Sequence, residues 1–99
     1  MIHDLAMPLP AIQKICNRYS VAELAVFGSA IRDDFRPDSD IDLLVTFHPE
    51  ARIGLVAFVG LQQELSDLLQ RPVDLVSKRG LKPVIRDEIL ASARVLYED

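Results

Sequence analysis

Three aspartates have the clearest capacity for chemistry in this sequence. Asp40 and Asp42 form an Asp-x-Asp motif at the start of an apolar run, and Asp74 lies in a second apolar run, Pro72 to Val76. Residues two apart on a β-strand share a face, with Cα atoms about 6 to 7 Å apart. Carboxylate oxygens, water and substrate phosphates are the ligands that Mg²⁺ prefers. The pattern predicts a site for two magnesium ions that serves in-line phosphoryl or nucleotidyl transfer, with Asp74 as third ligand and general base.

A Gly-Ser pair supplies a complementary phosphate-binding element. Gly28 and Ser29 stand ten residues before Asp40. Glycine lets the backbone approach a phosphate closely, and the serine offers a hydroxyl and an N–H at the start of a helical turn expected over 30–34. Ser39, which ends a turn over 37–39, is a further nucleotide-binding candidate.

Each of these features has a plainer explanation when it is taken alone. Asp-x-Asp at the start of a strand also occurs on solvated surfaces, and Gly-Ser by itself marks a turn. The net charge of −4 is concentrated in residues 28–50, and solvation is the simplest explanation for Asp33, Asp34 and Asp38. The joint occurrence of all three features, in this order and spacing, is far more specific.

Apolar periodicity predicts the elements that position these residues. The chain has 99 residues, 49% of them hydrophobic, and this length suits a single domain over 1–99 with a loose arm over 1–7. The expected fold class is α/β (α+β), a small mixed sheet of about three to four strands flanked by helices. Helices are expected over 9–19, 54–69 and 82–93, and strands over 22–27, 40–47 and 73–76.

The expected compartment is a reducing cytoplasm. Cys16 is the one cysteine in the sequence, so no disulfide can form within the chain, and its place in an apolar helical pattern indicates core packing. The start lacks the pattern of a secretory signal, and no apolar stretch approaches the length of a membrane span.

These motifs resemble those of a known family. The Gly-Ser pair, ten residues, Asp40-x-Asp42 and a later strand aspartate, Asp74, are similar to the motifs of the DNA polymerase beta-like nucleotidyltransferases, and closely to the minimal single-domain (MNT) members. The resemblance extends from the first helix to the closing residues 95–97. It implies that Asp40, Asp42 and Asp74 bind magnesium and that Gly28 and Ser29 bind the triphosphate.

One further residue is assigned by the resemblance. Arg32, three residues after Ser29, matches an arginine common in the minimal members, which implies a contact with phosphate or with a partner. The glycine that often follows this arginine is Asp33 here, which departs from the pattern at the phosphate loop.

The resemblance also implies a biological role. Minimal members are similar to the antitoxin half of HEPN/MNT toxin–antitoxin pairs, so the implied reaction transfers AMP from ATP to a tyrosine hydroxyl of a cognate HEPN ribonuclease toxin. One alternative is a binding module that neutralises a helical partner by occlusion, through apolar residues such as Phe35 or Leu81. Another is nucleotidyl transfer to a small molecule such as an aminoglycoside.

A run of cations follows the Asp74 strand. Lys78, Arg79, Lys82 and Arg86 occur without an acid among them. They suit a clamp on the leaving pyrophosphate or a contact with a partner's acidic surface, and a solvated loop and helix face is the plainer alternative. The proposed chemistry requires no histidine, so His3 and His48 are not assigned a catalytic role.

Overall fold

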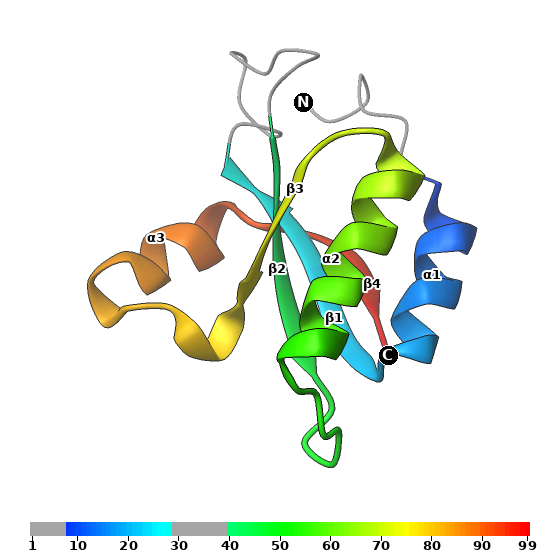
Figure 1. Ribbon diagram of the computed structural model, residues 1–99. Coiled ribbons are helices and arrows are strands. Elements are labelled where there is room, and N and C mark those ends of the chain that lie inside the picture. The colour runs from blue at the N-terminus through cyan, green and yellow to red at the C-terminus, as the bar shows by residue number, and fades with distance from the viewer. Residues whose placement is uncertain (1–7, 29–39) are drawn as a thin grey trace.

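The computed structural model describes residues 8–28 and 40–99 as helices packed against one four-stranded sheet (Figure 1). The expected arm over 1–7 and the expected turns over 30–34 and 37–39 lie outside these residues. Every helix and strand expected elsewhere is present, with ends within one residue of the prediction. In chain order the elements are α1 (Leu9–Arg18), β1 (Val21–Phe27), β2 (Ile41–Phe47), α2 (Leu55–Leu69), β3 (Val73–Ser77), the 3-10 helix η3 (Lys78–Gly80), α3 (Pro83–Ser92) and β4 (Arg94–Glu98).

The sheet is mixed, as expected, and its strand order is β3-β2-β1-β4. Strands β1 and β2 pair antiparallel, as do β1 and β4, whereas β2 and β3 pair parallel. A parallel pair requires a long crossover connection, and α2 provides it. The predicted α/β (α+β) class is confirmed. This topology sets the first residues of β2 and β3 side by side.

The strand β4 is an addition to the expected order, which ended with a helix. Its residues pair with β1, with Tyr97 opposite Leu24. The Tyr97 hydroxyl also donates a hydrogen bond of 2.9 Å to Asn17 Oδ1 on α1. Five residues with charges at both ends carry a weak strand signal, because only Tyr97 is buried. Tertiary pairing with β1 makes this segment a strand.

The hydrophobic core lies between the sheet and the helices α1 and α2. Alternate residues of the strands face these helices, and each fully buried large aliphatic side chain contributes about 1.5–3 kcal/mol. Cys16 is fully buried there, which confirms its packing role, and burial raises the pKa of its thiol to about 11. The core residues on the helices are Ile12, Ile15, Cys16, Leu61 and Leu65, and those on the strands include Leu24, Val26, Ile41, Leu43, Val45, Val73 and Leu75.

Polar side chains of α2 cover the outer edge of β3. The backbone N–H of Val73 donates to Ser66 Oγ at 3.0 Å, and that of Leu75 donates to Gln62 Oε1 at 3.1 Å. An edge strand leaves such donors unpaired unless another group covers them. These two hydrogen bonds therefore fix β3 against α2 as well as against β2.

The helix α3 packs less than the sequence suggests. Ile85, Ile89 and Ala93 recur on one side, yet no residue of α3 is buried, and Val84 is 84% exposed. Figure 1 shows α3 standing apart from α1 and α2, across the strands. Charged residues at 86–88 occupy the middle of the helix and narrow its apolar stripe.

Candidate active site

Asp42 and Asp74 are brought together by the parallel pairing of β2 and β3. They are register partners, so they lie directly opposite each other on neighbouring strands, about 4.8 Å apart in the backbone. Ile41 and Leu43 on β2 are buried on the core side, and Val73 and Leu75 on β3 likewise. Strand alternation therefore places both carboxylates on the other face of the sheet. Asp42 is partly buried, whereas Asp74 is exposed.

Asp40 lies at the same end of the sheet, immediately before β2. The strand begins at Ile41, whose N–H donates to the carbonyl oxygen of Pro72 at 2.9 Å. This hydrogen bond joins the start of β2 to the residue that precedes β3. Asp40 is exposed, one residue outside the strand that was expected to include it. The three aspartates thus occupy neighbouring positions at one end of two strands.

Gly28 completes this end of the sheet from the strand β1. Phe27, the last residue of β1, is the register partner of Asp42, and Gly28 follows with a φ of +73°. A Cβ at position 28 would lie 2.2 Å from Asp42 Oδ2, far inside van der Waals contact. Glycine is therefore required twice, for its backbone conformation and for the space of the Asp42 carboxylate. The sequence indicated a role for Gly28 toward phosphate but not this contact.

Comparison with known proteins assigns the chain to a family. Residues 10–96 match the nucleotidyltransferase domain family. The chain belongs to this family. It is 40% identical over 78 residues to the protein adenylyltransferase MntA of Thermococcus cleftensis, a match that covers 79% of this chain and 77% of that protein.

Solved structures agree with this assignment. A structure assigned as a minimal nucleotidyltransferase superposes with a TM-score of 0.77 at 36% identity and covers 94% of this chain and 93% of that chain. A chain from a complex of tri-AMPylated Shewanella oneidensis HEPN toxin with MNT antitoxin superposes with a TM-score of 0.65 at 22% identity, over 92% of this chain and 70% of that chain. The second match supports the fold alone. The predicted family, fold and enzyme class, a nucleotidyltransferase, are confirmed.

The remaining nucleotide-binding candidates of this nucleotidyltransferase are Ser29, Arg32 and Ser39. All three lie outside the described residues, as do Asp33, Asp34, Asp38 and Phe35. Their roles stay predictions based on the motif. The described residues on either side of this segment are Gly28 and Asp40, which both lie at the aspartate end of the sheet.

The donor set of the nucleotidyltransferase suits a hard cation. Within residues 8–28 and 40–99, no three His, Cys, Asp or Glu side chains gather closely enough to hold a metal by themselves. Carboxylates repel one another without a cation between them, and magnesium is usually bound by one or two carboxylates together with water and substrate phosphates. Asp42 and Asp74 in register, with Asp40 beside them, fit that kind of site.

Two of the cations after β3, Lys78 and Arg79, lie far from the aspartates. Lys78 Nζ lies 3.4 Å from Glu23 Oε1, and Glu23 pairs with Thr46, far along the sheet from Asp42. Arg79 lines a cavity at the same far end. A pyrophosphate clamp is therefore not supported for Lys78 or Arg79.

The end of β2 is tied to the end of the chain by an ion pair. His48 Nε2 lies 2.7 Å from Asp99 Oδ2 and so links the end of β2 to the chain end beyond β4. In the part of the chain that the structure describes, no helix has both the length and the apolar character to cross a bilayer.

Proposed function

We propose that this nucleotidyltransferase is a magnesium-dependent protein adenylyltransferase that transfers AMP from ATP to a tyrosine hydroxyl of a cognate HEPN-type ribonuclease toxin, and thereby acts as an antitoxin. The observation that carries the proposal is the pairing of Asp42 with Asp74 against Gly28. The identity to MntA, whose name states protein adenylyltransferase activity, supports the class of acceptor. The complex of an AMPylated HEPN toxin with an MNT antitoxin supports the kind of partner.

The residues divide the chemistry between them. Asp40, Asp42 and Asp74 supply oxygen ligands, and bound magnesium would neutralise charge on the triphosphate. Asp74 accepts the proton of the tyrosine hydroxyl as general base. The tyrosine oxygen then forms a bond to the α-phosphorus of ATP, the bond from that phosphorus to the bridging oxygen breaks, and pyrophosphate leaves.

The chain's own surface favours a protein acceptor over nucleic acid. Its net charge is −4, whereas proteins that bind nucleic acid broadly need a basic face to displace counterions. AMP on a tyrosine near a ribonuclease site would add bulk and negative charge, which repels RNA. Transfer of AMP would therefore silence the toxin directly.

The decisive experiment measures label transfer to the partner. The protein is incubated with α-labelled ATP, magnesium and the HEPN protein encoded beside it. We expect label on a tyrosine of the partner, no label when a chelator removes magnesium, and no label with the Asp40→Ala, Asp42→Ala double variant. Asp67→Asn is the matched control, because Asp67 is an exposed acid on α2 that accepts a hydrogen bond from Gln63. No transfer by the wild type, or full transfer by the double variant, contradicts the proposal.

Neutralisation by occlusion is a second candidate, favoured by the exposed apolar residues on α2. Leu55 and Val56 are 78% and 88% exposed, and such a surface can bind a partner without any reaction. Leu81 is only partly buried, so it also remains available for contact. If a variant with Asp→Asn at positions 40, 42 and 74 still suppresses toxicity at equal abundance, occlusion rather than AMP transfer neutralises the toxin.

A further inference from the structure

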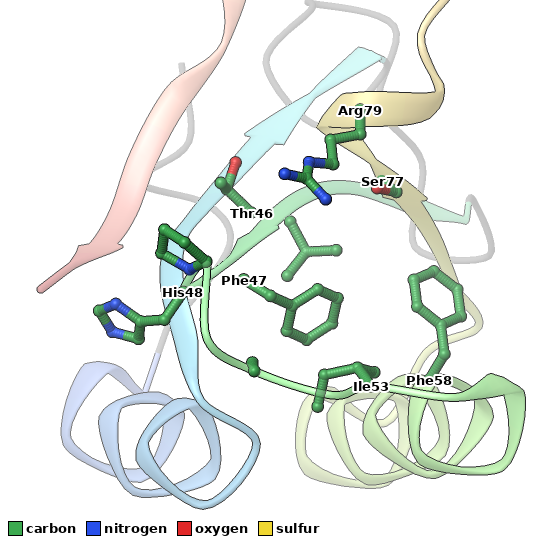
Figure 2. A pocket seen from close by; sticks show the side chains of 10 residues that line it. Thr46, Phe47, His48, Ile53, Phe58, Ser77 and Arg79 are labelled. Carbon is green, nitrogen blue, oxygen red and sulfur yellow. The ribbon is translucent and has the colours of Figure 1, made fainter.

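A cavity of about 250 Å³ lies at the end of the sheet opposite the aspartates (Figure 2). It forms where β2 and β3 end and the chain turns into α2. Its floor is apolar, and the rings of Phe47 and Phe58 meet there edge to face with centroids 6.3 Å apart. Ile53, from the loop before α2, closes the lower side (Figure 2).

Arg79 brings a positive charge to this apolar cavity. It extends from η3 so that its guanidinium lies between Thr46 and Ser77, which contribute hydroxyl groups to the lining (Figure 2). Among the described residues Arg79 makes no hydrogen bond or ion pair, in contrast to its neighbour Lys78, which pairs with Glu23. A fork of unpaired donors above aromatic rings suits a carboxylate that is attached to an apolar group.

The apolar surface continues from the cavity onto the first turns of α2. Leu55 lies one helical turn before Phe58 and is 78% exposed, and Val56 and Val59 are 88% and 51% exposed. Contiguous exposed apolar surface of this kind marks protein interaction sites. Arg52, an exposed cation, lies in sequence between two residues that line the cavity.

We infer that this surface, which we call the arginine pocket (the cavity with Arg79, together with Leu55, Val56 and Val59), docks an acidic, apolar segment of the acceptor protein. One apolar side chain fills the cavity, and a neighbouring carboxylate pairs with Arg79. The role of acceptor rests on the proposed function. The volume lies below the range of about 300–1,000 Å³ of small-molecule sites, and the exposed surface on α2 extends beyond it. Both observations favour a protein segment.

The arginine pocket is far from the reacting groups. Asp42 and Phe47 are five residues apart on the same strand, which corresponds to about 17 Å. Contacts at this distance exist equally before and during the transfer of AMP, so they strengthen binding without changing the chemical step. Loss of such contacts raises KM and leaves kcat unchanged.

Binding and turnover of two exposed-residue variants test the inference. Arg79→Glu and Val56→Asp are compared with Lys14→Glu, a charge reversal at an exposed position of α1. The Kd for the HEPN protein encoded beside the chain is measured by calorimetry, and KM and kcat are measured by AMP transfer. We expect Arg79→Glu to raise Kd and KM at least about tenfold with kcat within about twofold. Val56→Asp follows the same direction, and Lys14→Glu changes neither constant.

The outcomes separate this inference from the proposed function. Unchanged Kd and KM in Arg79→Glu overturn the inference even if AMP transfer by the wild type is intact. A fall in kcat at constant KM also overturns it, because Arg79 would then act on the reaction. If the partner binds in an Arg79-dependent manner but receives no AMP, the docking surface stands and the proposed reaction fails. Absence of binding by the wild type overturns the docking surface.

Discussion

The two ends of the strands β2 and β3 differ in nearly every physical property. At their second residues, Asp42 and Asp74 meet in register beside Gly28. Beyond their last residues, aromatic rings and Arg79, which has no partner among the described residues, surround a cavity. The end with the aspartates is anionic, with the Gly28 backbone against a carboxylate. The end with Arg79 is apolar and cationic, and its cavity can hold a side chain of a partner. The same two strands thus hold reacting groups and a recognition surface, which allows mutations to separate chemistry from binding.

The difference also concerns tolerance to change. At the aspartate end, a single added carbon at position 28 would overlap the Asp42 carboxylate. At the arginine pocket, the side chains of Arg79, Leu55 and Val56 are exposed and can adapt. We therefore expect substitutions at the first end to act through geometry and substitutions at the second end to act through affinity.

The largest effect is expected from Asp42→Asn. The amide keeps the shape of the side chain but loses the negative charge, so the rate of AMP transfer should fall about 10²–10³-fold, the range for a lost electrostatic contact at a reacting centre. The Kd for the partner should stay within about twofold, because the arginine pocket is intact. Rates from labelled ATP and Kd from calorimetry check both statements. A parallel loss of partner binding would show that the two ends are not separable.

The next effect is expected from Gly28→Ala. The new Cβ must displace the Asp42 carboxylate, and a misplacement of about 1 Å costs about 100-fold in rate. The left-handed backbone adds about 1–2 kcal/mol of destabilisation, measured by chemical unfolding. Gly80→Ala is the control near the arginine pocket, because nothing lies within 4 Å of a Cβ there. Equal rates for the two variants would contradict the assigned contact.

The sequence revealed most of the aspartate end and little of the other. Asp40, Asp42 and Gly28 could be predicted as site residues because the chemistry restricts residue type and spacing within a short segment, and the structure sets them at one end of the sheet. The contact of Gly28 with Asp42 was missed, since it depends on the antiparallel register of β1 and β2. The arginine pocket was missed because residues 45–58 and 77–79 meet only through the tertiary fold. The one indication in the sequence was the run of cations after the Asp74 strand, for which a contact with a partner's acidic surface was one of the roles considered.

The elements show the same division. Long periodic helices and buried strands were predicted to within a residue, because burial of one face sets their pattern. The strand β4 was missed, because only Val95 and Tyr97 are strand-forming residue types and the segment is short. The packing of α3 was also misjudged, since an apolar spacing in sequence does not supply a surface to cover it. The roles of Ser29, Arg32 and Ser39 remain predictions.

Truncation of a buried leucine and of an exposed leucine should differ in their effect on the stability of the fold. Leu65 is fully buried beneath the sheet, so Leu65→Ala should lower the free energy of unfolding by about 2–5 kcal/mol. Leu55→Ala, at a residue that is 78% exposed, should change it by less than about 0.5 kcal/mol while weakening partner binding. Denaturant titration of both variants checks this. A similar stability loss for the two leucines would place Leu55 in the core.

The smallest effect is expected at a polar cluster that joins the end of α1 to α2. The Tyr19 hydroxyl and the Arg18 guanidinium donate to Glu64, and these contacts hold the pKa of Glu64 below its usual value of 4.5. A carboxyl group whose pKa is lower in the folded state stabilises the fold above pH 4.5, and this stabilisation disappears as the pH falls through the folded value. Glu64→Gln should therefore lower the melting temperature slightly at pH 7 and converge with the wild type in acid.

The control for this pH dependence is Glu88→Gln, at an exposed position of α3. Its melting temperature should follow the wild type from pH 7 down to pH 3. A Glu64→Gln difference that is constant over the whole range would mean that packing, and not the charge of Glu64, accounts for the effect.

The hydrogen bonds from Val73 and Leu75 to side chains of α2 have a consequence for how the molecule can assemble. Their donors are already occupied, so an incoming strand cannot extend the sheet beside β3 without first displacing Ser66 and Gln62. On the β4 side, α1 contacts the strand through Tyr97 and Asn17, but in the part of the chain described no helix side chain hydrogen-bonds to the β4 backbone. A larger sheet, whether built by a second copy or by a partner's strand, would therefore extend more readily from β4 than from β3, away from the aspartates of β2 and β3.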